Sequence, residues 1–361
     1  VQPDPLRDAS TGLVDAGNWS VTDTWQIPAD AVSGIYIAKL VREDGTFGEN
    51  HIPFIVRNDA STSDIVFQTS DSTWQAYNGW GGANLYGGNG PGGDSAPGRA
   101  YAVSYNRPIT TRDYGGTYSG PQDYIFGAEY STLRFLEANG YDVTYISGVD
   151  TARYGENLLN HKVFLSVGHD EYWSAQQRAN VEAARDAGVS LAFLSGNAMY
   201  WKTRWEASID GSETDYRTMV TYKETRAGGK IDPSDEWTGT WRDLSYDPAL
   251  GGQTPENALQ GTQFTVDSYR LDTIEIPYEM TQLRFWRNTS AAETQAGQTA
   301  TLVQNLLGYE WDSAPDNPFT PDGLIRLSQT SIAVDTLLYD YGTTVGPGIA
   351  THNLTMYRTE S

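Results

Sequence analysis

The sequence contains no cysteine among its 361 residues. Disulfide bonds, zinc sites with thiolate ligands and catalysis by a cysteine nucleophile are therefore excluded. Lysine is also scarce, whereas glycine, threonine, serine and aspartate are plentiful. This balance is typical of secreted bacterial proteins, and we expect an extracellular location.

Positive charge is in short supply as well. The chain has 24 Lys and Arg residues against 46 Asp and Glu residues, and its net charge is −22. No cluster of basic residues reverses this sign locally, and an acidic protein repels phosphate backbones, so we expect no nucleic-acid partner. No stretch approaches the roughly 20 consecutive apolar residues that a membrane-spanning helix needs. We therefore expect a soluble chain without a membrane span.

Aromatic residues are abundant, with 23 Tyr and 11 Trp. They supply buried area together with hydroxyl and indole groups that need partners. A chain of this length exceeds the size at which a single core usually stops growing, so we expect one large domain and a smaller one.

The N-terminal part reads as a β-hairpin. Residues 34–41 and 52–56 alternate in polarity around a turn at Glu43, Asp44 and Gly45. Because few other strands precede residue 60, we expect residues 1–60 to form a partial β-sandwich-like domain, joined by a polar linker at residues 58–64.

The following segment, residues 61–361, reads as an α/β domain with a β-rich C-terminal part. Short apolar runs predict buried strands at residues 65–69, 142–146, 162–167 and 189–194. Helices are predicted between them at residues 129–138 and 174–187, with Ser174 as the N-cap. This alternation predicts a parallel sheet with helices on both faces, similar to the core of glutamine amidotransferases. Further strands are predicted at residues 262–266, 302–303, 332–334 and 352–357.

Residues 71–123 carry no sustained period, and a loop of that length is usually functional. Its glycine-rich stretch at residues 87–93 lacks the Lys-Ser/Thr of a phosphate-binding loop, which favours a flexible loop. Ser195 follows a strand, but the Gly-x-Ser-x-Gly pattern of a serine nucleophile is absent. A serine hydrolase is therefore disfavoured.

Ligands bind beyond the carboxyl ends of the strands in open α/β sheets, so the loops after residues 69, 167 and 194 should converge. The second of these loops carries His169, Asp170 and Glu171, whose imidazole and carboxylates suit a hard metal ion. The same carboxylates could instead cap the helix that follows, at its positive dipole end. The local sequence leaves both interpretations open.

Several motifs together resemble the large-subunit family of N,N-dimethylformamidase, an iron-dependent amidase. They are TWQAYN at residues 73–78, GGANLY at 81–86, GHDEYWS at 168–174, SGNAMYW at 195–201, TWR at 240–242, PEN at 255–257 and GYE at 308–310.

The resemblance implies a ferric iron ion held by two tyrosines and one glutamate, which correspond to Tyr77, Tyr86 and Glu171. Because the loop around Tyr86 varies in length, the second tyrosine could instead be one of three others: Tyr101, Tyr105 or Tyr118. The resemblance also places an asparagine and a second glutamate near the metal, corresponding to Asn197 and Glu310. In the implied chemistry Glu310 activates water, Asn197 stabilises the oxyanion and His169 orients Glu171.

The implied function is metal-dependent hydrolysis of a small amide or a related C–N bond. Two alternatives are a non-catalytic extracellular binding or structural module on the same scaffold, and a hydrolase of a different bond. Family members extend beyond both ends of this chain, so we expect either a fragment or a fold that a second polypeptide or another copy completes.

Overall fold

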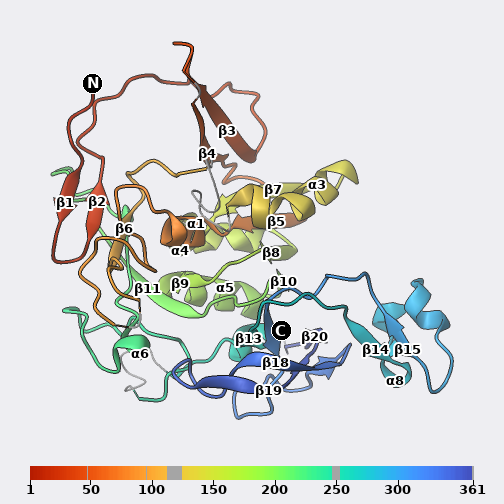
Figure 1. The fold of residues 1–361 in the computed structure, drawn as a ribbon. Helices are drawn as coiled ribbons and strands as arrows, with labels where there is room; N and C mark the ends of the chain where they lie inside the picture. The colour runs from red at the N-terminus through yellow and green to blue at the C-terminus, as the bar shows by residue number, and fades with distance from the viewer. Residues whose placement is uncertain (47, 95, 112–123, 246–252, 360–361) are drawn as a thin grey trace. The chain divides into compact units, whose positions relative to one another are not determined.

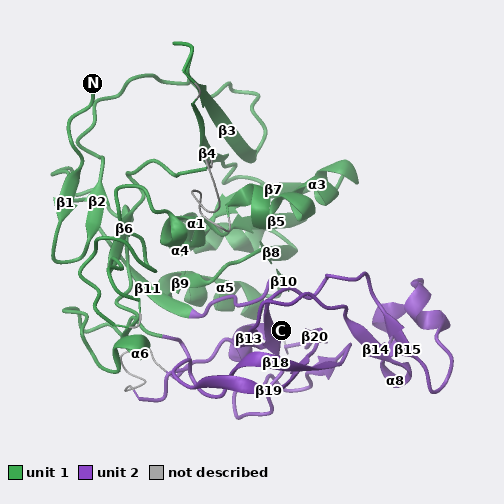
Figure 2. Cartoon of the chain, in the orientation of Figure 1, with its two compact units in different colours: residues 1–194, 201–239 green, residues 195–200, 240–361 purple. Residues whose placement is uncertain are grey.

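The computed structural model describes residues 1–46, 48–94, 96–111, 124–245 and 253–359 (Figure 1). The chain divides into two compact units, coloured separately in Figure 2. Unit 1 comprises Val1–Leu194 and Trp201–Gly239, and unit 2 comprises Ser195–Tyr200 and Thr240–Ser361. Residues 1–60 lie within unit 1.

The centre of unit 1 is a four-stranded sheet in which every neighbouring pair is parallel. Its strand order is β10 (Ser190–Leu194), β8 (Val163–Val167), β5 (Ile65–Thr69) and β7 (Val143–Ser147). The predicted parallel sheet is thereby confirmed, including the adjacency of β8 and β10. The finer comparison with glutamine amidotransferases stays a prediction.

Helices cover both faces of this sheet, as its apolar strands require. On one face Phe67 and Leu165 form a core cluster with Leu136 of α3 (Tyr130–Ala138). On the other face Gln177 of α5 (Ala175–Asp186) donates to Gln68 across 3.1 Å. Ser174 caps α5 by accepting from the Gln177 backbone, as predicted.

The N-terminal hairpin is present as predicted. Strands β3 (Gly34–Val41) and β4 (Glu49–Val56) pair antiparallel along their whole length. Ile35 and Ile55 pack against the same core cluster as α3. A second hairpin, β1 (Leu6–Asp8) with β2 (Leu13–Asp15), precedes it.

Two features of unit 1 differ from the prediction. Residues 71–77 form helix α1 (Asp71–Tyr77) instead of a loop. Because Asp71–Ala76 are all buried, this helix has no polar face and therefore no sequence period. In addition, short strands that the sequence did not signal form a mixed sheet: β6 (Ala102–Ser104), β12 (Thr218–Val220), β11 (Trp201–Glu206) and β9 (Tyr172–Ser174).

Unit 2 is β-rich, as expected. Its main sheet has the order β16 (Glu310–Ser313), β13 (Gln263–Asp267), β18 (Thr330–Leu338) and β19 (Val345–His352). Val266, Trp311 and Val334 lie in its core. The strand predicted at residues 302–303 is wrong, because β15 ends at Thr301 and Leu302 packs beside the core as a partly buried side chain. The strand predicted at 352–357 is interrupted after His352.

The remaining elements are short. In unit 1 they are α2 (Ile125–Ala128), α4 (Gly148–Arg153), η1 (Gly155–Asn160) and α6 (Glu224–Ala227). In unit 2 they are α7 (Asn257–Gln260), β14 (Glu275–Pro277), α8 (Tyr278–Thr281), η3 (Arg284–Trp286), η4 (Ser290–Glu293), β15 (Thr299–Thr301), β17 (Ile325–Arg326) and β20 (Thr355–Met356). Among the residues that the structure describes, no helix has the length and apolar character needed to cross a membrane.

Candidate functional site

Two tyrosines and a glutamate from three separate segments of unit 1 meet beyond the carboxyl end of the parallel sheet. The Tyr86 hydroxyl lies 2.8 Å from each carboxylate oxygen of Glu171. The Tyr77 hydroxyl lies 3.1 Å from Glu171 Oε2 and 2.8 Å from the Tyr86 hydroxyl. The two tyrosine rings stack with centroids 4.4 Å apart. Three oxygen-bearing side chains thus converge on one point.

Local hydrogen bonds hold each segment in place. Asn84 accepts from the Tyr86 backbone at 2.8 Å and donates to the Tyr77 carbonyl at 2.9 Å, so one amide fixes the distance between both tyrosines. The Glu171 backbone donates to Thr73 Oγ1 of α1 at 3.0 Å. Helix α1 and the loop after β8 are therefore tied together at the site.

His169 and Tyr172 contact these three residues. His169 Nε2 lies 3.4 Å from Glu171 Oε2, and its ring lies 5.7 Å from the Tyr77 ring. The Tyr172 hydroxyl donates to the Tyr86 hydroxyl across 2.7 Å. Burial and the charge of Glu171 raise the pKa of both Tyr86 and Tyr172 well above its ordinary value. Without a bound cation, both hydroxyls therefore keep their protons.

A buried lysine lies against the same tyrosines. Lys223 Nζ is 3.5 Å from the centroid of the Tyr86 ring, 4.8 Å from that of Trp201 and 5.2 Å from that of Tyr172. Its side chain is fully buried. Burial and the charge of Arg226 lower the pKa of Lys223 well below its ordinary value, while the charge of Glu171 opposes that shift.

The donor set suits a hard, highly charged cation. Phenolate and carboxylate oxygens are the ligands that such ions prefer, and a bound cation would reverse the upward pKa shift of the tyrosines. Within the described part of the chain, no three His, Cys, Asp or Glu side chains group together as a metal site. The tyrosine hydroxyls are thus needed to complete a ligand set here.

The other tyrosines considered for the second ligand position have different surroundings. The Tyr105 hydroxyl donates to Asp71 Oδ2 at 2.8 Å. The Tyr101 ring stacks on Tyr222 with centroids 4.4 Å apart. Tyr118 lies outside the described residues. Among the described candidates, Tyr86 is the one placed against both Tyr77 and Glu171.

The capping interpretation of the acidic pair is wrong. Ser174 caps α5, and strand β9 separates Glu171 from that helix. The Asp170 carboxylate instead accepts from Gln68 at 2.7 Å and from Ser166 at 2.8 Å. Asp170 therefore stabilises the sheet edge while Glu171 faces the tyrosines.

Asn197 and Glu310 belong to unit 2 and are close to each other there. The Asn197 backbone, at a left-handed φ of 56°, donates to Asp312 Oδ1 across 2.9 Å. A Cβ atom on the neighbouring Gly196 would lie 2.6 Å from the Glu310 carbonyl oxygen, so only glycine fits. Burial raises the pKa of Asp312 to about 6.

Sequence reasoning missed Tyr172 and Lys223. Tyr172 directly follows Glu171, but the sequence did not signal strand β9 and therefore did not indicate where the Tyr172 side chain lies. Lys223 lies 52 residues beyond Glu171 in a segment without periodicity, and no local signal could have found it.

The whole chain, residues 1–361, matches the family model described as "N,N-dimethylformamidase beta subunit-like, C-terminal". A search of curated proteins found no match. The resemblance inferred from the motifs is thus confirmed, and the match extends over both units. The chain belongs to the N,N-dimethylformamidase beta subunit-like family, to its C-terminal part.

Proposed function

We propose that this chain is an iron-dependent hydrolase of small linear amides. The observation that carries the proposal is the convergence of Tyr77, Tyr86 and Glu171, whose oxygens lie 2.8–3.1 Å apart. Membership in a dimethylformamidase-like family supports a hydrolase-like role. The identity of the metal and the substrate class come from the resemblance.

Tyr77, Tyr86 and Glu171 would hold the ion. Ferric iron bound by these oxygens would supply Lewis acidity toward an amide carbonyl and acidify bound water. His169, 3.4 Å from Glu171, would keep that carboxylate oriented. Tyr172 would hold the Tyr86 oxygen through its 2.7 Å hydrogen bond. Both neighbours thus act by fixing the geometry of the ligands.

The roles of Glu310 and Asn197 come from the resemblance alone. An amide nitrogen is a poor leaving group, so a base that takes a proton from water must return one to the departing amine. We assign this task to Glu310. We assign to the Asn197 amide a hydrogen bond to the developing oxyanion.

The proposal also includes a second polypeptide as partner and a glutamine amidotransferase-like core. The family's description names a beta subunit, which supports a second polypeptide in the active assembly. The parallel order of β10, β8, β5 and β7 supports a glutamine amidotransferase-like core.

The test is to purify the protein without added metal, measure its metal content, and assay release of amine or ammonia from N,N-dimethylformamide, formamide and acetamide. Stoichiometric iron, a visible phenolate-to-iron band and amide turnover are expected. Protein that holds no iron and has no turnover after iron reconstitution would favour the binding module. Protein that binds iron but does not hydrolyse these amides would support the metal site and refute the amidase assignment.

A further inference from the structure

Lys223 is buried in a setting that disfavours a charge. Its side chain is fully buried, and Nζ has no hydrogen-bond partner among the described residues. An ammonium group removed from water without hydrogen bonds is strongly destabilised unless other charges or aromatic faces compensate. The three ring faces around Nζ and the charge of Glu171 favour the ammonium form, whereas the charge of Arg226 opposes it.

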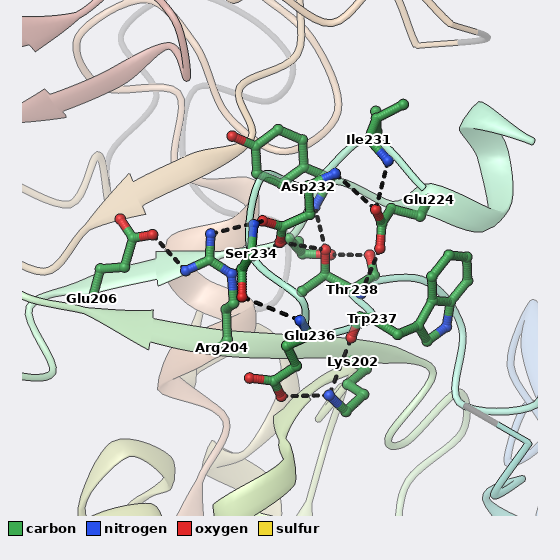
Figure 3. Close-up of polar contacts among 12 residues, drawn as sticks. Lys202, Arg204, Glu206, Glu224, Ile231, Asp232, Ser234, Glu236, Trp237 and Thr238 are labelled. Carbon is green, nitrogen blue, oxygen red and sulfur yellow. Dashed lines mark hydrogen bonds and ion pairs between the residues drawn. The ribbon is translucent and has the colours of Figure 1, made fainter. Parts of the chain in front are cut away.

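The backbone holds Lys223 in this place against its conformational preference. Its φ of 45° is left-handed, a region that non-glycine residues occupy only where the surroundings impose it. The next residue, Glu224, is held firmly, because its carboxylate accepts from the backbones of Ile231, Asp232 and Thr238 at 2.7–2.8 Å (Figure 3).

The network around Glu224 extends over several elements. Asp232 accepts two hydrogen bonds of 2.9 Å from Arg204 of β11, and one from Thr238 (Figure 3). Lys202 of the same strand donates to Glu236 and to the Trp237 carbonyl. Lys223 is therefore anchored at its backbone by a buried polar network, while its ammonium group is directed at the Tyr86 ring.

We propose that Lys223 is a positioning residue for Tyr86, packing on its ring to hold the hydroxyl toward Glu171. In the iron-bound form the negative charges of Glu171 and of the Tyr86 phenolate favour the ammonium form of Lys223, which places a positive charge over the ring face. A cation above a neutral aromatic ring is stabilised by roughly 0.5–2 kcal/mol, and a phenolate ring carries a full negative charge in addition. The charge of Lys223 would then lower the energy of the phenolate electrons and weaken their donation. This inference rests on the proposed function, since it concerns the iron-bound form of Tyr86.

The alternative is that Lys223 merely fills the core. Lys223→Met separates the two, because methionine keeps most of the unbranched apolar stem and removes the charge. Lys223→Gln is a second neutral variant in case methionine does not fold. The matched control is Lys162→Met, an exposed lysine just before β8, which pairs with Asp64 at the opposite end of that strand from the site.

The measurement is the visible absorption spectrum of each protein loaded with one equivalent of ferric iron. Without the positive charge, less energy is needed to move an electron from phenolate to iron, so the charge-transfer band of Lys223→Met and Lys223→Gln should shift to longer wavelength. Lys162→Met should match the wild type. Bands that match the wild type in both Lys223 variants at equal iron content would overturn the inference. A wild-type protein without any such band would instead reject the iron site itself.

Discussion

The Tyr86 hydroxyl lies 2.8 Å from both carboxylate oxygens of Glu171, although 85 positions separate the two residues in the chain. This contact exists because the segment after β5, which continues through α1 to Tyr86, and the loop after β8 leave the same edge of one parallel sheet. Anionic forms of both groups so close together would repel each other without a cation between them.

Glu171→Gln should reduce the iron content to background and abolish amide turnover. The amide replaces an anionic ligand by a neutral one, and its nitrogen cannot bind a cation. Inductively coupled plasma mass spectrometry on the purified variant measures the effect. Glu182→Gln, at a partly exposed position of α5 where Glu182 pairs with Arg178, is the matched control and should keep wild-type iron. Stoichiometric iron in Glu171→Gln would remove Glu171 from the ligand set.

Tyr86→Phe and Tyr105→Phe distinguish the second tyrosine ligand. Removing the Tyr86 hydroxyl should weaken the phenolate-to-iron band and lower iron affinity, because that oxygen contacts both Tyr77 and Glu171. Removing the Tyr105 hydroxyl breaks only its hydrogen bond to Asp71 and should leave the band in place. The reverse pattern would identify Tyr105 as the ligand. Titration with ferric iron, followed by absorption, gives both quantities.

Glu310→Gln should keep the metal and lose turnover. A base contributes typically 10²–10⁴-fold to a rate, so kcat should fall by about that factor while the iron content stays at the wild-type value. Steady-state kinetics on N,N-dimethylformamide and metal analysis of the same sample check this. Simultaneous loss of iron would show that Glu310 binds the metal and that its assigned role is wrong.

Unfolding stability should fall as the pH rises toward 8, because of Glu129. Its buried carboxyl accepts from Ser70 and Trp74, and burial raises its pKa from 4.5 to about 8. Between these values the unfolded chain has released the proton while the folded chain keeps it, so rising pH favours unfolding. The stabilisation by protonated Glu129 is fully present below the unfolded-state pKa of 4.5 and is lost above the folded-state pKa of about 8.

Urea unfolding at pH 5, 6.5 and 8 measures this slope. Glu129→Gln should make the slope shallower, since the amide does not titrate while Asp312 still does. Glu43→Gln in the exposed turn after β3 should leave the slope unchanged. An unchanged slope in Glu129→Gln would show that the Glu129 carboxyl is ionised in the folded protein at neutral pH.

Glu224→Gln should destabilise the protein by about 1–3 kcal/mol, because the amide nitrogen would face a backbone N–H that now donates to a carboxylate oxygen. Glu236→Gln, a partly exposed member of the same network, should cost less. Urea unfolding at a single pH compares the two. Equal effects would mean that Glu224 does not anchor the segment that carries Lys223.

The sequence by itself determined the secondary structure wherever a period was present. The hairpin at β3 and β4, the strands of the parallel sheet and helices α3 and α5 follow from alternation, apolar runs and capping, which act between residues close in the chain. The motifs also identified the family, and they singled out Tyr77, Tyr86 and Glu171 for one site.

Only the tertiary structure determined the elements and contacts that have no local sequence signal. Helix α1 is buried on all sides and so lacks a polar face, and the short strands β6, β9, β11 and β12 exist only because their partners lie beside them. Tyr172 and Lys223 join the tyrosines through packing between distant segments. The sequence pattern reflects interactions between residues that are close in the chain. The contacts among these side chains depend instead on which distant segments pack together in the folded core.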